Sequence, residues 1–197
     1  MGTAGFIFVA VLLVLALWAA AVYNRLRLLR NRVENAWSQI DVQLKRRYDL
    51  IPNLVEVARG YMQHEASTLE AVAKARNQAV QASDALRGHA RSDAELGAFT
   101  AAEQLLGGSL GRLMMVAEAY PELKADAQMQ SLSEEIASTE NRIGFARQAY
   151  NDQVMEFNDK ASQFPDLILA RLLGFMHQTM LQSTSSEQER IAPQVRF

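Results

Sequence analysis

The chain has 197 residues, and its 20 basic and 22 acidic side chains leave a net charge of −2, which argues against binding nucleic acid or other polyanions. It has no cysteine, which excludes disulfides, thiolate metal sites and cysteine nucleophiles. Ten glycines and four prolines are few for a β-rich fold with many turns, whereas the abundant Leu, Ala, Glu, Gln and Arg favour helices. The composition therefore predicts an all-α protein.

The N-terminal segment contains an apolar run, residues 4–22, without one charged side chain. As a helix, these ~19 residues span roughly 28 Å, about the thickness of the hydrocarbon core of a bilayer. A core helix of a soluble protein would show a polar face, and this run shows none. We predict that residues 1–22 comprise a short N-terminal segment and a transmembrane helix.

A cleavable signal peptide is the alternative, because Ala19, Ala20 and Ala21 offer small residues for cleavage. Against it, no basic residue precedes the run, and the basic cluster follows it instead. This membrane-proximal cluster consists of Arg25, Arg27, Arg30 and Arg32. Its position predicts the N-terminus outside and the C-terminal domain in the cytoplasm. The cluster either contacts anionic lipid headgroups or only determines the membrane topology, with its side chains in solvent.

Residues 23–48 continue as a helix, since apolar residues recur every three or four positions from Leu26 to Leu44. No Gly or Pro separates this stretch from the apolar run, so a rigid stalk is expected. Lys45, Arg46 and Arg47 are expected on a solvated face. Pro52 either kinks one long helix or begins a new one, capped by Asp49.

From Asn53 the helical pattern resumes and extends to Leu86, and residues 87–91 read as a turn. Ser92 with Glu95 matches a capping box at the start of the next helix, which Tyr120-Pro121 ends. Three glycines inside it, Gly107, Gly108 and Gly111, predict close packing or a local irregularity. They do not form a phosphate loop, because no Lys-Ser/Thr follows and no strand precedes them.

A long coiled-coil-like helix is predicted from Met129 to Phe164, where apolar residues alternate steps of three and four. Beside that stripe lies a ladder formed by Asn141, Gly144, Asn151 and Asn158. We predict that its three asparagines fix the pairing of helices, with ligand binding as the less favoured alternative. Glu140 and Arg147 are candidates for the same buried polar pairing.

A final apolar helix is predicted over residues 167–181, after Pro165. It is too short to span a membrane, so it either packs on the bundle or lies on the membrane surface. Residues 183–197 form a polar tail that is expected to be disordered.

Several short motifs occur along the chain: AWSQIDVQLKRR (36–47), DLIPNLV (49–55), HE (64–65), EAYP (118–121), LKA (123–125), TEN (139–141), AR (146–147), YN (150–151) and FP (164–165). Together they resemble the LemA family of bacterial membrane-anchored helical proteins. The resemblance implies an N-terminal anchor and a bundle of long antiparallel helices, but it supplies no reaction. Residues 126–129 depart from the family's pattern, in which an Asn-rich turn is expected.

Nothing in the sequence indicates catalysis. The residues three before His64, His89 and His177 are not glutamates, so the di-iron motif of helical bundles is absent. His64-Glu65 lacks the second histidine of a zinc protease helix. We predict a protein that is not an enzyme, with no catalytic residue, cofactor or metal.

The sequence therefore predicts a transmembrane helix followed by an antiparallel, four-helix-bundle-like domain over residues 23–182. The first hypothesis is a membrane-tethered scaffold at the bacterial inner membrane that contacts lipids and assembles as a homo-oligomer. Its predicted oligomer contacts are Leu26, Leu29, Val33 and Trp37. The alternative is an adaptor for another membrane protein, such as a membrane protease in envelope quality control.

Overall fold

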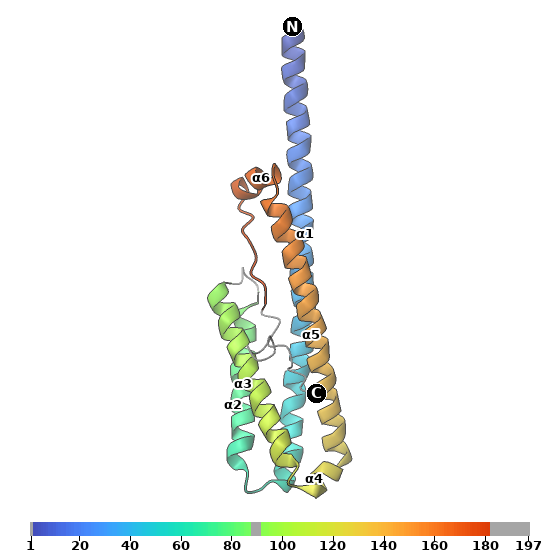
Figure 1. Ribbon diagram of the computed structural model, residues 1–197, viewed down its shortest axis with the longest axis vertical. Coiled ribbons are helices and arrows are strands. Elements are labelled where there is room, and N and C mark those ends of the chain that lie inside the picture. Colours follow the sequence, from blue (N-terminus) through green and yellow to red (C-terminus); the bar gives the residue numbers. More distant parts are fainter. Residues whose placement is uncertain (1, 88–91, 182–197) are drawn as a thin grey trace, which may run out of the picture. The chain divides into compact units, whose positions relative to one another are not determined.

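The computed structural model describes residues 2–87 and 92–181, and within these ranges it contains helices and no strand (Figure 1). The helices are α1 (Thr3–Tyr61), α2 (Ala66–Ala85), α3 (Asp93–Ala117), α4 (Pro121–Ala125), α5 (Ala127–Ser162) and α6 (Asp166–Leu172). The predicted all-α fold is confirmed. The predicted disordered tail lies outside the described residues, as does most of the predicted turn at 87–91.

The chain divides into two compact units, and α1 and α5 each contribute to both. Unit 1 combines Met1–Trp37 with Ala149–Met180 and therefore contains α6. Unit 2 combines Ser38–Gln148 with Leu181. The residues that we assigned to a single bundle are thus shared between two units.

Helix α1 continues without a break through Pro52, so the hypothesis that Pro52 begins a new helix is wrong. Proline has no N–H, and the carbonyl four residues earlier, that of Tyr48, therefore lacks its helical donor. The Arg76 side chain on α2 donates from Nε to this carbonyl oxygen at 3.1 Å. Asp49 is not a cap, because its carboxylate accepts a 2.8 Å hydrogen bond from Lys45 one turn earlier.

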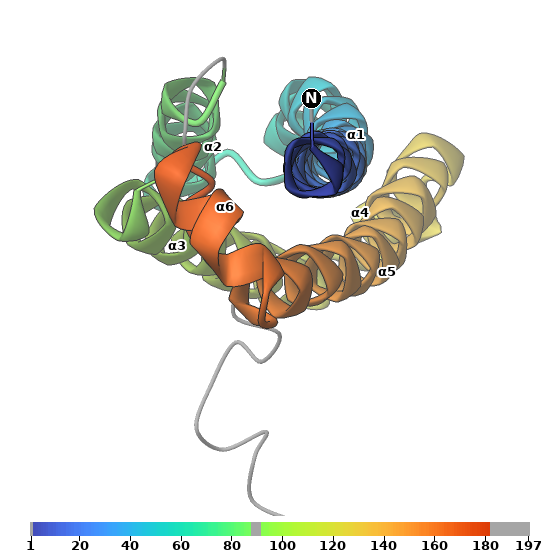
Figure 2. The same cartoon turned by 90° about the horizontal axis from the view of Figure 1, so that it is seen from above.

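The helix predicted from Asn53 to Leu86 is broken in the structure, since α1 ends at Tyr61 and α2 begins at Ala66. The predicted apolar stripe has no member between Tyr61 and Leu69, and the chain reverses in that gap. Glu65 donates from its backbone N–H to the Met62 carbonyl at 3.1 Å within the turn. The reversal lets α2 run back along the part of α1 in unit 2 (Figures 1 and 2).

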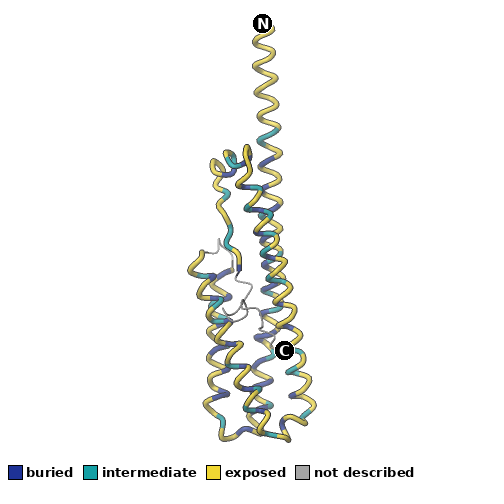
Figure 3. Tube along the Cα trace, in the orientation of Figure 1, coloured by how far each residue is buried: buried dark blue, intermediate teal, exposed yellow. Residues whose placement is uncertain are grey.

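The core of unit 2 is formed by one face from each of α1, α2, α3 and α5 (dark blue in Figure 3). Its largest apolar members include Ile40, Leu44, Ile51, Leu54, Met62, Leu86, Phe99, Leu106, Leu113 and Ile143. The capping box at Ser92 is confirmed, with Glu95 N–H donating to Ser92 Oγ at 3.2 Å and Ser92 N–H donating to Glu95 Oε2 at 2.9 Å. Helix α3 therefore begins where the sequence predicted.

The glycines of α3 are neither tightly packed nor irregular, contrary to expectation. Helix α3 is uninterrupted, and a Cβ placed on Gly107, Gly108 or Gly111 would meet no atom within 4 Å. All three glycines are exposed. The predicted close approach is therefore absent among the residues that the structure describes.

The residues that depart from the family's pattern form the start of α5. Asp126 Oδ1 accepts a 2.9 Å hydrogen bond from the Met129 backbone N–H, and Oδ2 accepts one of 3.0 Å from the Tyr61 hydroxyl. These bonds, the one from Met129 above all, lower the pKa of Asp126. The anionic carboxylate is thus an effective N-terminal cap, which an asparagine-rich turn would otherwise supply.

Unit 1 buries one stripe of α1 against α5 and α6. The α1 side chains are Val22, Leu26, Leu29, Val33 and Trp37, and their partners include Tyr150, Val154, Phe157, Ala161 and Ala170. The Trp37 and Tyr150 rings meet edge to face, with centroids 5.6 Å apart. Phe164, predicted to belong to the buried stripe of α5, lies beyond the end of that helix and is exposed.

The predicted final helix, residues 167–181, is only partly correct. Helix α6 ends at Leu172 because Gly174 has a φ of +73°, a conformation that L side chains rarely adopt. The Phe175 N–H then donates to the Ala170 carbonyl at 2.9 Å and the Gly174 N–H to the Arg171 carbonyl at 3.3 Å, a Schellman motif. Residues 175–181 follow without helical structure.

Candidate functional site

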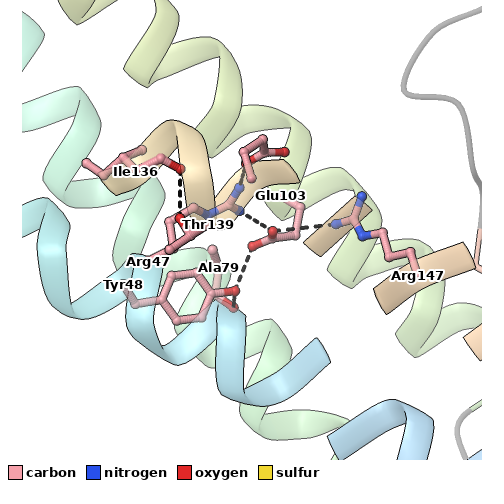
Figure 4. A network of polar contacts seen from close by, with 8 residues as sticks. Arg47, Tyr48, Ala79, Glu103, Ile136, Thr139 and Arg147 are labelled. Atoms are coloured by element: carbon pink, nitrogen blue, oxygen red, sulfur yellow. Dashed lines mark hydrogen bonds and ion pairs between the residues drawn. The ribbon is translucent and has the colours of Figure 1, made fainter. Parts of the chain in front are cut away.

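A network of charged side chains in unit 2 centres on the buried residues Arg47, Tyr48 and Glu103 (Figure 4). It also includes the exposed Glu140 and the half-buried Arg147. Arg47 and Tyr48 come from α1, Glu103 from α3, and Glu140 and Arg147 from α5. Arg47 is only 2% exposed, so the prediction of a solvated face is wrong for this residue. Lys45 and Arg46 are exposed as expected, and Arg46 pairs with Glu135.

Glu103 is the centre of the network. Arg47 forms ion pairs with both Glu103 and Glu140, and Arg147 Nη2 lies 3.6 Å from Glu103 Oε2. The Tyr48 hydroxyl donates to Glu103 Oε1 at 2.6 Å. Two guanidinium groups thus face two carboxylates, so the formal charges of these side chains cancel.

Tyr48 serves as a neutral donor in this network. Burial raises the pKa of Tyr48 far above its ordinary value, and the negative charge of Glu103 and the hydrogen bond to it raise it further. Arg47 opposes these effects in part. The phenol therefore keeps its proton, and its oxygen also lies 3.4 Å from the Ala79 carbonyl of α2.

The network links α1, α3 and α5 within unit 2. Both Glu103 oxygens already accept hydrogen bonds from protein donors. The Arg147 guanidinium lies 5.9 Å from the Phe99 ring centroid, which adds a cation–π contact. Such a network of paired charges favours one arrangement of the helices, because other arrangements would leave the buried Arg47 and Glu103 unpaired.

Sequence reasoning anticipated Glu140 and Arg147 as participants but missed the other three. A signal for them was present. Arg47 and Tyr48 fall on the stripe between Leu44 and Ile51, and Glu103 falls between Phe99 and Leu106. A charged residue at a core position on two helices is the pattern that indicates a buried pair.

The asparagine ladder does not act as one unit. Asn141 is exposed, as is Gly144. Asn151 is half-buried and belongs to unit 1. Asn158 hydrogen bonds to the backbone of Gln178, donating from Nδ2 at 2.8 Å and accepting at Oδ1 at 2.9 Å. Its partner is therefore the non-helical segment after α6, not another helix.

The four predicted oligomer contacts are already covered within the chain. Leu26, Leu29, Val33 and Trp37 are all buried inside unit 1. The periodicity correctly marked an apolar face, but that face packs against α5 and α6. The assignment of these side chains as a free oligomer surface is corrected to an internal contact.

The membrane-proximal basic cluster splits into two pairs. Arg25 and Arg32 lie 3.2 and 3.6 Å from the Glu156 carboxylate of α5. Arg27 is exposed and Arg30 half-buried, and no ion pair involves either of them within residues 2–87 and 92–181. These two cations are the members of the cluster that remain available to another anion.

From Thr3 to Ala21, the residues of α1 are exposed, apart from Trp18 and Ala19, which are half-buried. By length and composition, α1 is the one helix in the described part of the chain that is apolar enough to cross a membrane. No group of three or more His, Asp or Glu suited to a metal ion occurs among these same residues.

An exposed apolar helix end joined to a helical bundle with a buried ion network defines a membrane-associated helical protein. The profile of the LemA family matches residues 36–197, and the chain belongs to this family.

Curated relatives share part of their length with the chain. It is 26% identical over 168 residues to Magnetosome protein MamQ 2 of Paramagnetospirillum magneticum, which covers 78% of this chain and 62% of that protein. It is also 26% identical over 153 residues to Magnetosome protein MamQ of Magnetospirillum gryphiswaldense, covering 70% of this chain and 56% of that one. The chain thus spans about three fifths of the length of these relatives.

Proposed function

We propose that the protein is a non-enzymatic, membrane-tethered scaffold that assembles with copies of itself at the bacterial inner membrane. The observation that carries the proposal is Phe145, a large apolar side chain of α5 in unit 2 that is 73% exposed. Leu105 and Met115 of α3, in the same unit, are also exposed. Together they give unit 2 apolar groups that a second copy can cover.

The exposed glycines of α3 support the same proposal. Gly107, Gly108 and Gly111 lie in sequence between Leu105 and Met115, and space is open around each of them. A helix surface without side chains allows another backbone to approach closely. Anchoring in a membrane also favours association, because it confines every copy to one surface and raises the effective concentration.

Orientation is part of the proposal. The basic cluster directly after the apolar run favours placing that end of α1 on the cytoplasmic side. Arg27 and Arg30 then face anionic headgroups. A reporter fused after Phe197 should be active in the cytoplasm, and activity only in the periplasm would contradict this orientation.

Self-assembly is tested by the mass of the protein in mild detergent. The wild type should be larger than a monomer, and the double variant Met115→Gln with Phe145→Gln should shift toward the monomer with unchanged helicity. The matched control is Ala101→Gln with Ala137→Gln, two exposed alanines on the same helices. A monomeric wild type would refute self-assembly, and an adaptor for another membrane protein would become the better proposal.

A further inference from the structure

Helix α6 and its flanks expose an apolar stripe that the fold does not use. Ile168 and Leu172 of α6 are four residues apart, so they share one face of that helix. The exposed Phe164 precedes the helix, and Met176 follows it. Phe164 is 81%, Leu172 78% and Met176 75% exposed. The opposite face of α6 is packed, with Asp166 and Ala170 buried.

Contacts within unit 1 place this stripe beside the end of the apolar run of α1. Ala170 shares a buried cluster with Val22 and Leu26, and Trp18 packs against that cluster. The Phe175 ring meets the Tyr23 ring edge to face, with centroids 6.0 Å apart. In Figure 3, drawn in the orientation of Figure 1, α6 lies at the level where the trace of α1 changes from exposed to partly buried. An apolar span of about 30 Å that begins near Thr3 ends at this level.

The charges near α6 also suit a bilayer surface. Asp166 is the one acidic residue between Gln163 and Leu181, and it is buried and paired with Lys160 at 2.6 Å. Arg171 is exposed on α6. The segment therefore presents apolar side chains and a cation, the combination that binds at the interface of anionic membranes.

We propose that α6 is a second membrane contact, whose Phe164–Ile168–Leu172 stripe enters the headgroup and upper acyl region of the bilayer that α1 crosses. This inference rests on the proposed anchoring by α1. The lipid is the occupant because the packed face of α6 meets α1 at Val22, where the apolar run that α1 exposes to the bilayer ends, so the stripe lies at the level of the bilayer surface. A short helix beside the anchor would hold the first part of unit 1 against the membrane.

The test uses the full-length protein in vesicles of three parts phosphatidylcholine to one part phosphatidylglycerol. Because the chain has no cysteine, Ile168→Cys and Leu172→Cys each carry a single NBD label at an exposed position. Asp152→Cys, exposed on α5 in the same unit, is the aqueous control, and Val14→Cys reports on the apolar run of α1. Lipids with a doxyl group near the headgroup are the quencher for the labels at Ile168, Leu172 and Asp152. Lipids with a doxyl group deep in the acyl chain are the quencher for the label at Val14, which lies in the middle of the apolar run.

The labels at Ile168 and Leu172 should emit at shorter wavelength than the label at Asp152 and lose fluorescence to the doxyl lipid. Labels that behave like the one at Asp152, while Val14 is quenched, would overturn the α6 contact and leave the anchor intact. A blue shift without quenching would show that protein covers the stripe, and would also overturn it. An unquenched Val14 would overturn both the anchor and the contact that depends on it.

Discussion

Arg76 on α2 donates from Nε to the carbonyl oxygen of Tyr48 at 3.1 Å, the carbonyl that Pro52 leaves without a helical donor. A charged side chain thus replaces the missing backbone bond, and α1 passes through a proline without ending. The same contact joins α2 to α1 next to the buried ion network.

Replacing Arg76 with Met should lower the free energy of unfolding by about 2 kcal/mol, because a partly buried carbonyl loses a charge-assisted hydrogen bond. The loss of unfolding free energy should be smaller in a Pro52→Ala background, because the new backbone N–H can donate to the Tyr48 carbonyl oxygen. Chemical unfolding of the four variants in detergent measures this coupling. Lys74→Met, an exposed substitution on α2, is the control. An equal cost of Arg76→Met in both backgrounds would contradict the explanation.

Glu103→Gln should destabilise unit 2 by about 3–5 kcal/mol, because it removes the buried carboxylate that pairs with Arg47 and faces Arg147. Glu134→Gln, exposed on α5, should change stability by less than about 0.5 kcal/mol. Combining Arg47→Met with Glu103→Leu should recover much of the loss, since an apolar pair needs no counter-charge. Similar melting of the two glutamine variants would show that the network contributes little.

Tyr48 should make the protein sensitive to alkaline pH. Its pKa is raised in the folded state from an ordinary value of 10.0. Above that value the unfolded chain releases the proton while the folded chain retains it, so the free energy of unfolding falls by up to about 1.4 kcal/mol per pH unit. Below it both states are protonated, and the contribution is fully present.

Tyr48→Phe should remove this dependence, so that the stability difference between wild type and variant narrows as the pH rises above the ordinary value. Unfolding curves at about pH 8 and about pH 11 test the expectation. Tyr120→Phe, which alters a half-buried tyrosine outside the network, should retain the wild-type slope. The account fails if Tyr48→Phe and Tyr120→Phe show the same alkaline slope.

Asn158→Ala should release the segment after α6, because both the nitrogen and the oxygen of the Asn158 side-chain amide hydrogen bond to the Gln178 backbone. Hydrogen exchange of the Gln178 N–H should accelerate, while the oligomeric mass stays as in the wild type. Asn141→Ala, at the exposed end of the ladder, should leave that exchange unchanged. A change of mass on Asn158→Ala would instead restore the hypothesis that the ladder pairs subunits.

The sequence by itself determined those features whose causes are local. The apolar run before Tyr23, the stripes of α1, α3 and α5, and the capping box at Ser92 follow from the types of neighbouring residues and their spacing. The gap in the stripe after Tyr61 was a local signal as well, and it marked the turn between α1 and α2.

Only the tertiary structure decided which partner covers each face. A stripe such as Leu29 and Val33 requires burial but does not say whether a second copy or the same chain supplies it, and here α5 and α6 do. Arg47 looked solvated because its partners Glu103 and Glu140 lie 56 and 93 residues away. A charge can be buried only where the fold brings a counter-charge to it. The local spacing of residues does not show which distant residue will supply that counter-charge.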